Sequence, residues 1–79
     1  MITELTPISE LCFSMTDDVP RAAMKYAGCD LLVVDDAGDV WYLHAERDAE
    51  VWACHPGTRD AGTIAAIMRG AKGFIAIRA

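Results

Sequence analysis

Residues 31–48 read L-L-V-V-D-D-A-G-D-V-W-Y-L-H-A-E-R-D, and the first fifteen of them predict a β-hairpin. Residues 31–34 form a continuous apolar run with two β-branched members, which predicts a strand buried on both faces. The D-D-A-G-D segment at 35–39 predicts a turn, because aspartate stabilises turn conformations and Gly38 accepts a positive φ. Residues 40–45 then return as the partner strand.

The segment before this hairpin predicts a strand followed by a short helix. Residues 11–16, L-C-F-S-M-T, alternate in part between apolar and polar side chains, which favours a first strand. Either Asp17 or Asp18 supplies an N-cap for a helix. Pro20 fits only in the first turn of that helix, and Gly28 is placed to end it with a left-handed cap.

The ten residues after the hairpin carry mixed signals. The A-E-R-D-A-E segment favours helix, whereas V-W-A-C-H favours strand. We expect a turn at 46–49 and a third hairpin-connected strand at 50–55. Pro56 and Gly57 would then end that strand.

The last third of the chain predicts a second helix and a final strand. Asp60 is placed to cap the helix. The apolar residues of the helix recur at i, i+3, i+4 and i+7: Ile64, Ile67, Met68 and Ala71. Gly70 and Gly73 are expected to end it, before a strand formed by F-I-A-I at 74–77.

These elements predict one α+β domain over residues 1–79, in the order β-α-β-β-β-α-β. The sheet is expected to be antiparallel or mixed, with both helices packed on one face. Hydrophobic residues make up 53% of the 79, which is enough for a packed core in so short a chain. The high apolar content also suggests that some apolar surface is covered, either by a second copy in a homodimer or by a partner.

Charge is distributed unevenly along the chain. Residues 30–50 hold seven acidic residues against Arg47 alone, a net charge of −6 in a chain whose total is −5. Residues 51–79 hold four basic residues against Asp60, a net charge of +3. Direct binding to a nucleic-acid backbone is not expected at the acidic segment, because such binding relies on Lys and Arg.

No motif in the sequence predicts a catalytic or metal-binding site. The cysteines, Cys12, Cys29 and Cys54, are odd in number and lack metal-ligand spacing, so small buried thiols or an intermolecular disulfide are the readings that remain. The start of the chain lacks the features of a signal peptide, and no run is long enough for a membrane span. We therefore expect a cytoplasmic protein that is not an enzyme and uses no metal or cofactor.

One local pattern resembles half of a cystathionine-β-synthase (CBS) motif, whose form is V-V-D-x-x-G, a strand and then T-x-x-D. Val33, Val34, Asp35 and Gly38 match it, and Asp48 arrives at the family's spacing. The resemblance implies an adenine-nucleotide-sensing module or a fragment of one, with Asp48 on the ribose. The chain departs from the pattern where Tyr42 replaces a glycine and Ala45 replaces the threonine.

In size, acidity and lack of catalytic motifs the chain also resembles small phage-encoded inhibitors, anti-CRISPR proteins among them. That resemblance implies a non-catalytic inhibitor or adaptor, in the cytoplasm of an infected bacterium, that blocks nucleic-acid binding by a CRISPR surveillance complex as a DNA mimic. Aromatic residues ringed by charge are typical of protein interfaces. The expected partner-binding residues are Asp30, Asp35, Asp36, Asp39, Trp41, Tyr42, Glu46, Asp48 and Glu50. The expected partner is a basic nucleic-acid-binding protein complex, with no membrane involved.

Overall fold

The computed structural model describes residues 4–55 and 57–78. Its strands are β1 (Thr6–Pro7), β2 (Ser14–Thr16), β3 (Val19–Arg21), β4 (Cys29–Asp35), β5 (Val40–Ala45), β6 (Val51–His55) and β7 (Ala71–Arg78). The helical segments are α1 (Ala61–Arg69) and two 3-10 turns, η1 (Ile8–Leu11) and η2 (Met24–Tyr26).

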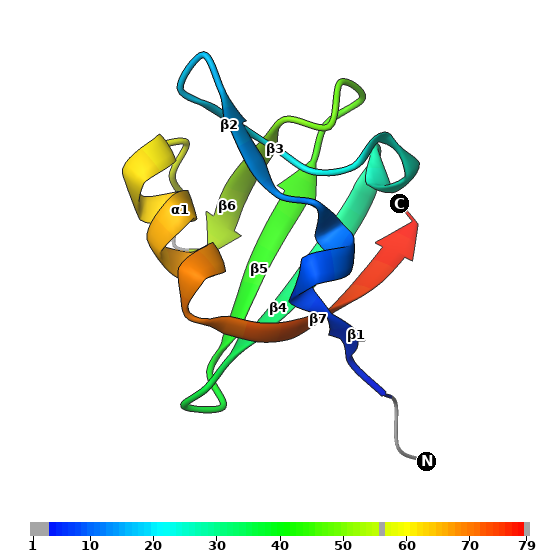
Figure 1. Cartoon of the computed structure of the whole chain (residues 1–79), viewed down its shortest axis with the longest axis vertical. Coiled ribbons are helices and arrows are strands. Elements are labelled where there is room, and N and C mark those ends of the chain that lie inside the picture. The colour runs from blue at the N-terminus through cyan, green and yellow to red at the C-terminus, as the bar shows by residue number, and fades with distance from the viewer. Residues whose placement is uncertain (1–3, 56, 79) are drawn as a thin grey trace.

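Five strands form one sheet in the order β1-β7-β4-β5-β6, and β2 and β3 form a separate two-stranded sheet. All of the strand pairs are antiparallel. Figure 1 shows α1, η1 and the β2–β3 hairpin on the same side of the larger sheet. The predicted α+β class is confirmed, and the sheet is antiparallel rather than mixed.

The hairpin predicted from residues 31–45 is present as β4 and β5. Their register places Val34 opposite Val40 and Asp30 opposite His44, and Gly38 takes a φ of +88° in the turn. The prediction that the first strand is buried on both faces is wrong. Burial alternates along β4, because the helices and the small hairpin cover one face of the sheet only.

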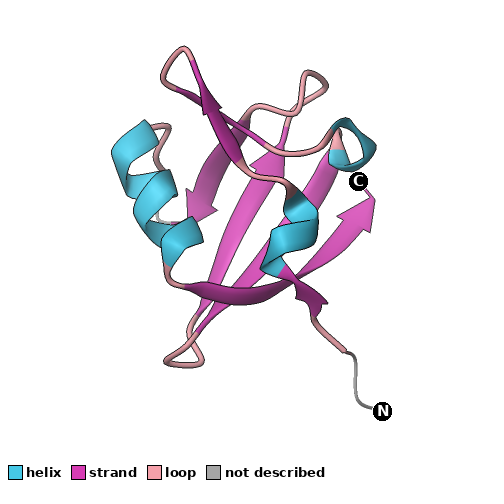
Figure 2. Cartoon of the chain, viewed as in Figure 1, coloured by secondary structure: helices cyan, strands magenta, loops and turns pink. Residues whose placement is uncertain are grey.

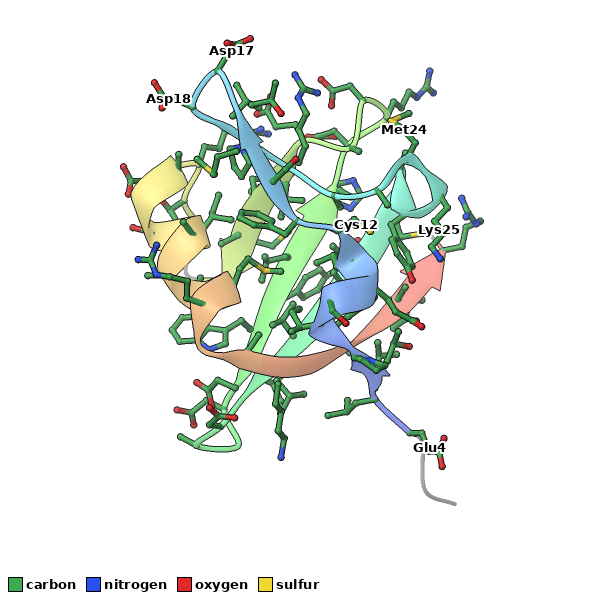
Figure 3. All side chains as sticks on the ribbon, viewed as in Figure 1. Glu4, Cys12, Asp17, Asp18, Met24 and Lys25 are labelled. Atoms are coloured by element: carbon green, nitrogen blue, oxygen red, sulfur yellow. The ribbon has the colours of Figure 1, made fainter. Side chains whose placement is uncertain are left out.

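The helix predicted between residues 17 and 28 is the main error in the expected element order. Asp17 and Asp18 both take positive φ values, of 53° and 62°, and form the tip of the β2–β3 hairpin (Figure 3). Aspartate tolerates this conformation better than most residues, so a tight turn replaces the expected N-cap. Pro20 pairs with Met15 in β3, where its missing N–H is tolerated in a two-stranded ribbon.

The neighbours of that hairpin differ from the prediction in the same way. The predicted strand at 11–16 is shortened to β2 because Leu11 belongs to η1. Gly28 does adopt a positive φ, of 81°, but it leads into β4 and donates its N–H to Ala45 O rather than closing a helix. Among residues 17–28, the only helical segment is the three-residue η2.

The predicted second helix is confirmed as α1. Asp60 is its N-cap and accepts from the backbone N–H of Thr63 at 2.8 Å, and Gly70 is its C-cap. Gly73, which was expected to end the helix, lies instead inside β7, where an added Cβ would come within 2.8 Å of the Leu5 side chain. Ala71 is likewise the first residue of β7 rather than a helical residue.

The core lies between the sheet and the elements that cover it (Figure 2). Strand side chains that point toward α1 and η1 are fully or almost fully buried: Leu31, Val33, Leu43, Ala45, Val51, Ala53 and Phe74. From the covering elements they meet Leu11, Ala22, Ile64, Ile67 and Met68. Neither α1 nor any other helix in the described part of the chain has the length and apolar character needed to cross a membrane.

Candidate protein-interaction surface

The opposite face of the sheet, here called the open face, carries no covering element among residues 4–55 and 57–78. Strand register and alternation place ten side chains on it: Asp30, Leu32, Val34, Val40, Tyr42, His44, Trp52, Cys54, Ile75 and Ile77. Val40, Tyr42 and Ile77 are 56%, 41% and 48% exposed. Large apolar side chains left this open on one face of a sheet are typical of a surface that meets another molecule.

Asp30 lies at the centre of a polar network at one end of the open face. Its carboxylate accepts a hydrogen bond from His44 Nδ1 at 2.8 Å, and the Tyr42 hydroxyl donates to the same group. An ionised carboxylate only accepts, so Nδ1 carries the hydrogen. The hydrogen bond from His44, followed by that from Tyr42, lowers the pKa of Asp30, while the bond to Asp30 raises the pKa of Tyr42.

The network continues from His44 to the loop after β6. His44 Nε2 lies 3.7 Å from Glu46, and Glu46 pairs with Arg59 at 3.3 Å. Arg59 also lies 3.8 Å from Glu50 and stacks over the Trp52 ring at 4.6 Å. Alternating charges thus extend from the open face to its edge, with carboxylates in the majority.

Two side chains of the open face, His44 and Cys54, belong to residue types that take part in acid–base or nucleophilic chemistry. His44 faces carboxylates at both of its nitrogens, Asp30 at Nδ1 and Glu46 at Nε2. Burial, followed by the nearby Asp30 and Glu46 carboxylates, raises the pKa of Cys54, which disfavours the reactive thiolate. Within the described ranges, no group of three or more His, Cys, Asp or Glu side chains is placed to hold a metal ion.

The cysteines occupy three different environments. Cys29 is buried, Cys54 is half-buried and Cys12 is exposed, and all three are free thiols. The expectation of small buried thiols therefore fails for Cys12, which lies at the left-handed end of η1.

The predicted acidic residues do not form one surface. Asp35, Asp36 and Asp39 lie at the β4–β5 turn, whereas Glu46, Asp48 and Glu50 lie near the β5–β6 turn, at the opposite end of β5. Six residues of strand separate the two groups, a span of roughly 20 Å. Only Asp30, Glu46 and Glu50 belong to the network on and beside the open face.

Asp35 has a structural role in its turn. Its carboxylate accepts from the backbone N–H groups of Ala37 and Asp39, both at 2.9 Å, and from the indole N–H of Trp41 at 3.1 Å. The hydrogen bond from Trp41 is the largest cause of the lowered pKa of Asp35. Asp36 and Asp39 are exposed at the tip of the turn, and they remain free to meet a partner's charge.

Trp41 and Tyr42 face opposite sides of the sheet, as their adjacent positions on a strand predict. Trp41 packs half-buried against the core and lines a cavity of about 260 Å³ beside α1. Tyr42 lies on the open face. Of the two expected aromatic contacts, Tyr42 therefore remains on an exposed surface, and Trp41 belongs to the covered side.

Asp48, the residue that the CBS resemblance places on a ribose, is engaged within the protein. Its carboxylate accepts from the backbone N–H of Glu50 at 2.9 Å and lies 3.4 Å from Arg21. A nucleotide would have to displace both contacts. The nucleotide alternative stays a prediction.

Several residues of this surface were not anticipated from the sequence. Leu32, Ile75 and Ile77 carry no signal beyond apolarity, and the ladder that aligns them pairs residues more than 40 positions apart. His44 and Arg59 join the network through partners 14 and 13 residues away. The alternation of side chains along β5 was a signal that places His44 on the same face as Tyr42. No sequence pattern indicated Arg59.

No family model, curated protein or solved structure matches the chain.

Proposed function

We propose that the chain is a non-catalytic protein-binding module that docks on its partner through the open face. The observation that carries the proposal is the strip of exposed and half-buried apolar side chains across β4, β5 and β7, with a carboxylate-rich network at its end. Interfaces combine an apolar, aromatic centre with a polar rim. Tyr42, which has both an apolar ring and a hydroxyl, would be the central contact.

The charges beside this surface support one class of partner. Asp30, Glu46 and Glu50 outnumber Arg59 within the network, and Asp36 and Asp39 extend the negative charge at the far end of β5. A complementary protein carries Lys or Arg around an apolar patch. A nucleic-acid-binding complex offers such basic surfaces, so an inhibitor that competes with nucleic acid, of the anti-CRISPR kind, is the specific form of the proposal.

The first experiment compares partner capture by two matched double variants. Val40→Ala with Tyr42→Ala truncates the open face, while Met15→Ala with Met24→Ala truncates apolar side chains that are 43% and 65% exposed elsewhere. Quantitative pull-down should lose the specific partner with the first variant and keep it with the second. Equal retention by both variants would sink the proposal.

The second experiment tests the charge and the anti-CRISPR form with a purified CRISPR surveillance complex. Reversal of Asp36 and Asp39 to Lys should weaken inhibition of target-DNA binding, and Asp35 is left intact because it holds the turn. The control reverses Glu4 and Glu10, which are exposed outside the open face, with the same change in net charge. Added salt should weaken binding by the wild type. Equal losses in both variants would mean that net charge acts rather than the carboxylates of the β4–β5 turn, and no inhibition by the wild type would exclude that complex as the partner.

A further inference from the structure

The two edges of the five-stranded sheet are covered to different extents. At the β6 edge, Ala53 exchanges two backbone hydrogen bonds with Thr58, at 2.9 and 2.8 Å. The start of the same edge is covered by a bridge between Glu50 and Arg21. Natural sheets commonly cover or block their edges in this way, since unpaired edges recruit other strands.

The other edge is covered over part of its length. β7 pairs with β4 from Ala71 to Arg78, with one irregularity between Val34 and Asp35, but β1 pairs only with Gly73 and Phe74. Glu4, two residues before β1, lies away from the end of β7 (Figure 3). Residues 75–78 therefore have no strand on their outer side within the part of the chain that the structure describes. We call this side the free edge.

Proline identifies which backbone groups point out of the free edge. Pro7 has no N–H, so in the β1–β7 ladder the pair that exchanges two hydrogen bonds must be Thr6 and Phe74. The backbone groups of Phe74 thus point away from β4. Directions alternate along a strand, so the N–H and C=O groups of Ala76 and Arg78 point outward as well.

The side chains of the free edge lack the usual protection. Ile75, Ala76 and Ile77 are apolar, and Ala76 and Ile77 are exposed. No proline or lysine interrupts them, although these are the residues that commonly block an edge. Arg78 is directed toward η2, where its guanidinium donates to Lys25 O and Ala27 O at 3.3 and 3.4 Å.

We propose that the free edge pairs with the same edge of a second copy of this chain, so that β7 and its counterpart run antiparallel across a two-fold axis at Ile77. In this register Ala76 faces Arg78 of the other copy, and each pair exchanges two backbone hydrogen bonds. All of the outward N–H and C=O groups of Ala76 and Arg78 are then satisfied. The two sheets join into one, and the open faces of both copies become continuous.

The side chains fit a second copy in this register. Ile77 meets its own counterpart at the axis as a non-hydrogen-bonded pair, the closer of the two antiparallel pair types. On the other face the small Ala76 leaves room for the Arg78 stem opposite it. An isologous contact of this kind closes after two copies, which gives a dimer rather than a filament. The inference goes beyond the proposed function, since it concerns the edge and not the centre of the open face.

Analytical ultracentrifugation of the full chain under reducing conditions tests the dimer. The wild type should pass from monomer to dimer between low micromolar and several hundred micromolar protein. Ala76→Pro removes an outward N–H without removing a bond to β4, and proline is tolerated at such positions. It should weaken dimerisation at least about tenfold, as should Ile77→Lys, which places two like charges at the axis. Circular dichroism checks that each variant is folded.

Two controls keep the result specific. Val40→Lys adds the same charge to an exposed apolar position of the open face away from the free edge, and it should leave the dimer unchanged. Ile77→Cys in a Cys12→Ser background should form a covalent dimer on oxidation, whereas Met24→Cys in that background should not. A wild type that stays monomeric throughout overturns the proposal, as do dimers that Ala76→Pro and Ile77→Lys weaken no more than Val40→Lys.

Discussion

The two faces of β4 carry similar residues in very different surroundings. Leu31 and Val33 are fully buried beneath α1 and η1, whereas Leu32 and Val34 lie between them in sequence and face the open side of the sheet. Four consecutive aliphatic side chains thus divide into two pairs with separate roles. Composition alone cannot say which residues of such a run are buried and which face solvent; the position of the covering elements does.

The same contrast applies along β5. Leu43 and Ala45 belong to the core, while Tyr42 and His44 join Asp30 on the open face. The covered face accounts for stability, because its apolar area leaves water when the chain folds. The open face keeps apolar area in contact with water, which binding could remove. The effects of substitutions on the two faces should therefore differ in kind.

The largest expected effect comes from truncating adjacent leucines. Leu31→Ala should lower the free energy of unfolding by about 2–5 kcal/mol, because it leaves a cavity in a closed core. Leu32→Ala should lower it by about 1 kcal/mol, since the side chain is already partly solvated. Urea denaturation measures both values. Equal losses of unfolding free energy in the two variants would mean that the open face is covered in solution. That result would contradict the difference described between the two faces of β4.

A second pair of variants compares adjacent aspartates in the β4–β5 turn. Asp35→Ala removes the acceptor for three hydrogen bonds and should lower the melting temperature clearly. Asp36→Ala, on an exposed side chain, should change it by less than about 3 °C. Thermal unfolding followed by circular dichroism gives both shifts. Similar shifts for the two variants would show that the turn does not depend on the Asp35 carboxylate.

A third prediction concerns the pH dependence of Asp30. Its folded pKa is lowered by hydrogen bonds from His44 and Tyr42, while the unfolded value is about 3.9. The stability that it contributes is therefore complete above the unfolded pKa and is lost as the pH falls through the folded pKa. As the pH falls from the unfolded pKa through the folded pKa, the difference in unfolding free energy between wild type and Asp30→Asn should shrink.

The cause of that dependence can be checked directly. NMR titration of the Asp30 carboxyl group should show its pKa rising toward the ordinary value in His44→Ala, since the hydrogen bond from His44 is the largest cause of the lowering. An unchanged pKa in this variant would contradict the network described for the open face.

The smallest expected effect is at the rim of the open face. Arg59→Ala removes a cation stacked on Trp52 and two surface ion pairs, and it should cost about 0.5–1 kcal/mol. Arg69→Ala is the control, since Arg69 makes no ion pair among the described residues; its effect should stay within about 0.5 kcal/mol. Urea unfolding at low and high salt would show whether the ion pairs or the stacking dominate.

Local signals predicted the parts of this fold that depend on neighbours in the chain. The turn around Gly38 and the cap at Asp60 were both correct, because each requires residue types suited to one local backbone geometry. The prediction of a helix around Pro20 was wrong because the local signals there fit two different structures. Asp17 and Asp18 suit either an N-cap or a left-handed turn, and pairing with β2 decided between them.

The candidate site was predicted in part. Asp30, Tyr42, Glu46 and Glu50 were anticipated from charge and aromaticity, and they lie on or beside the open face. The role of Asp35 in its turn was not anticipated, since a carboxylate that holds a turn and one that faces solvent are the same residue in sequence. Arg59 was missed because its partners come from another part of the chain.

The sequence by itself determined the β4–β5 hairpin, the α1 helix, the α+β class and the concentration of negative charge between residues 30 and 50. These follow from periodicity, turn chemistry and composition, which act over a few residues. Only the tertiary structure decided which face of the sheet is open, which strand edge is free and which carboxylates meet His44 and Arg59. Those features depend on where α1, η1 and the β2–β3 hairpin pack, and contacts between residues far apart in the chain fix that position.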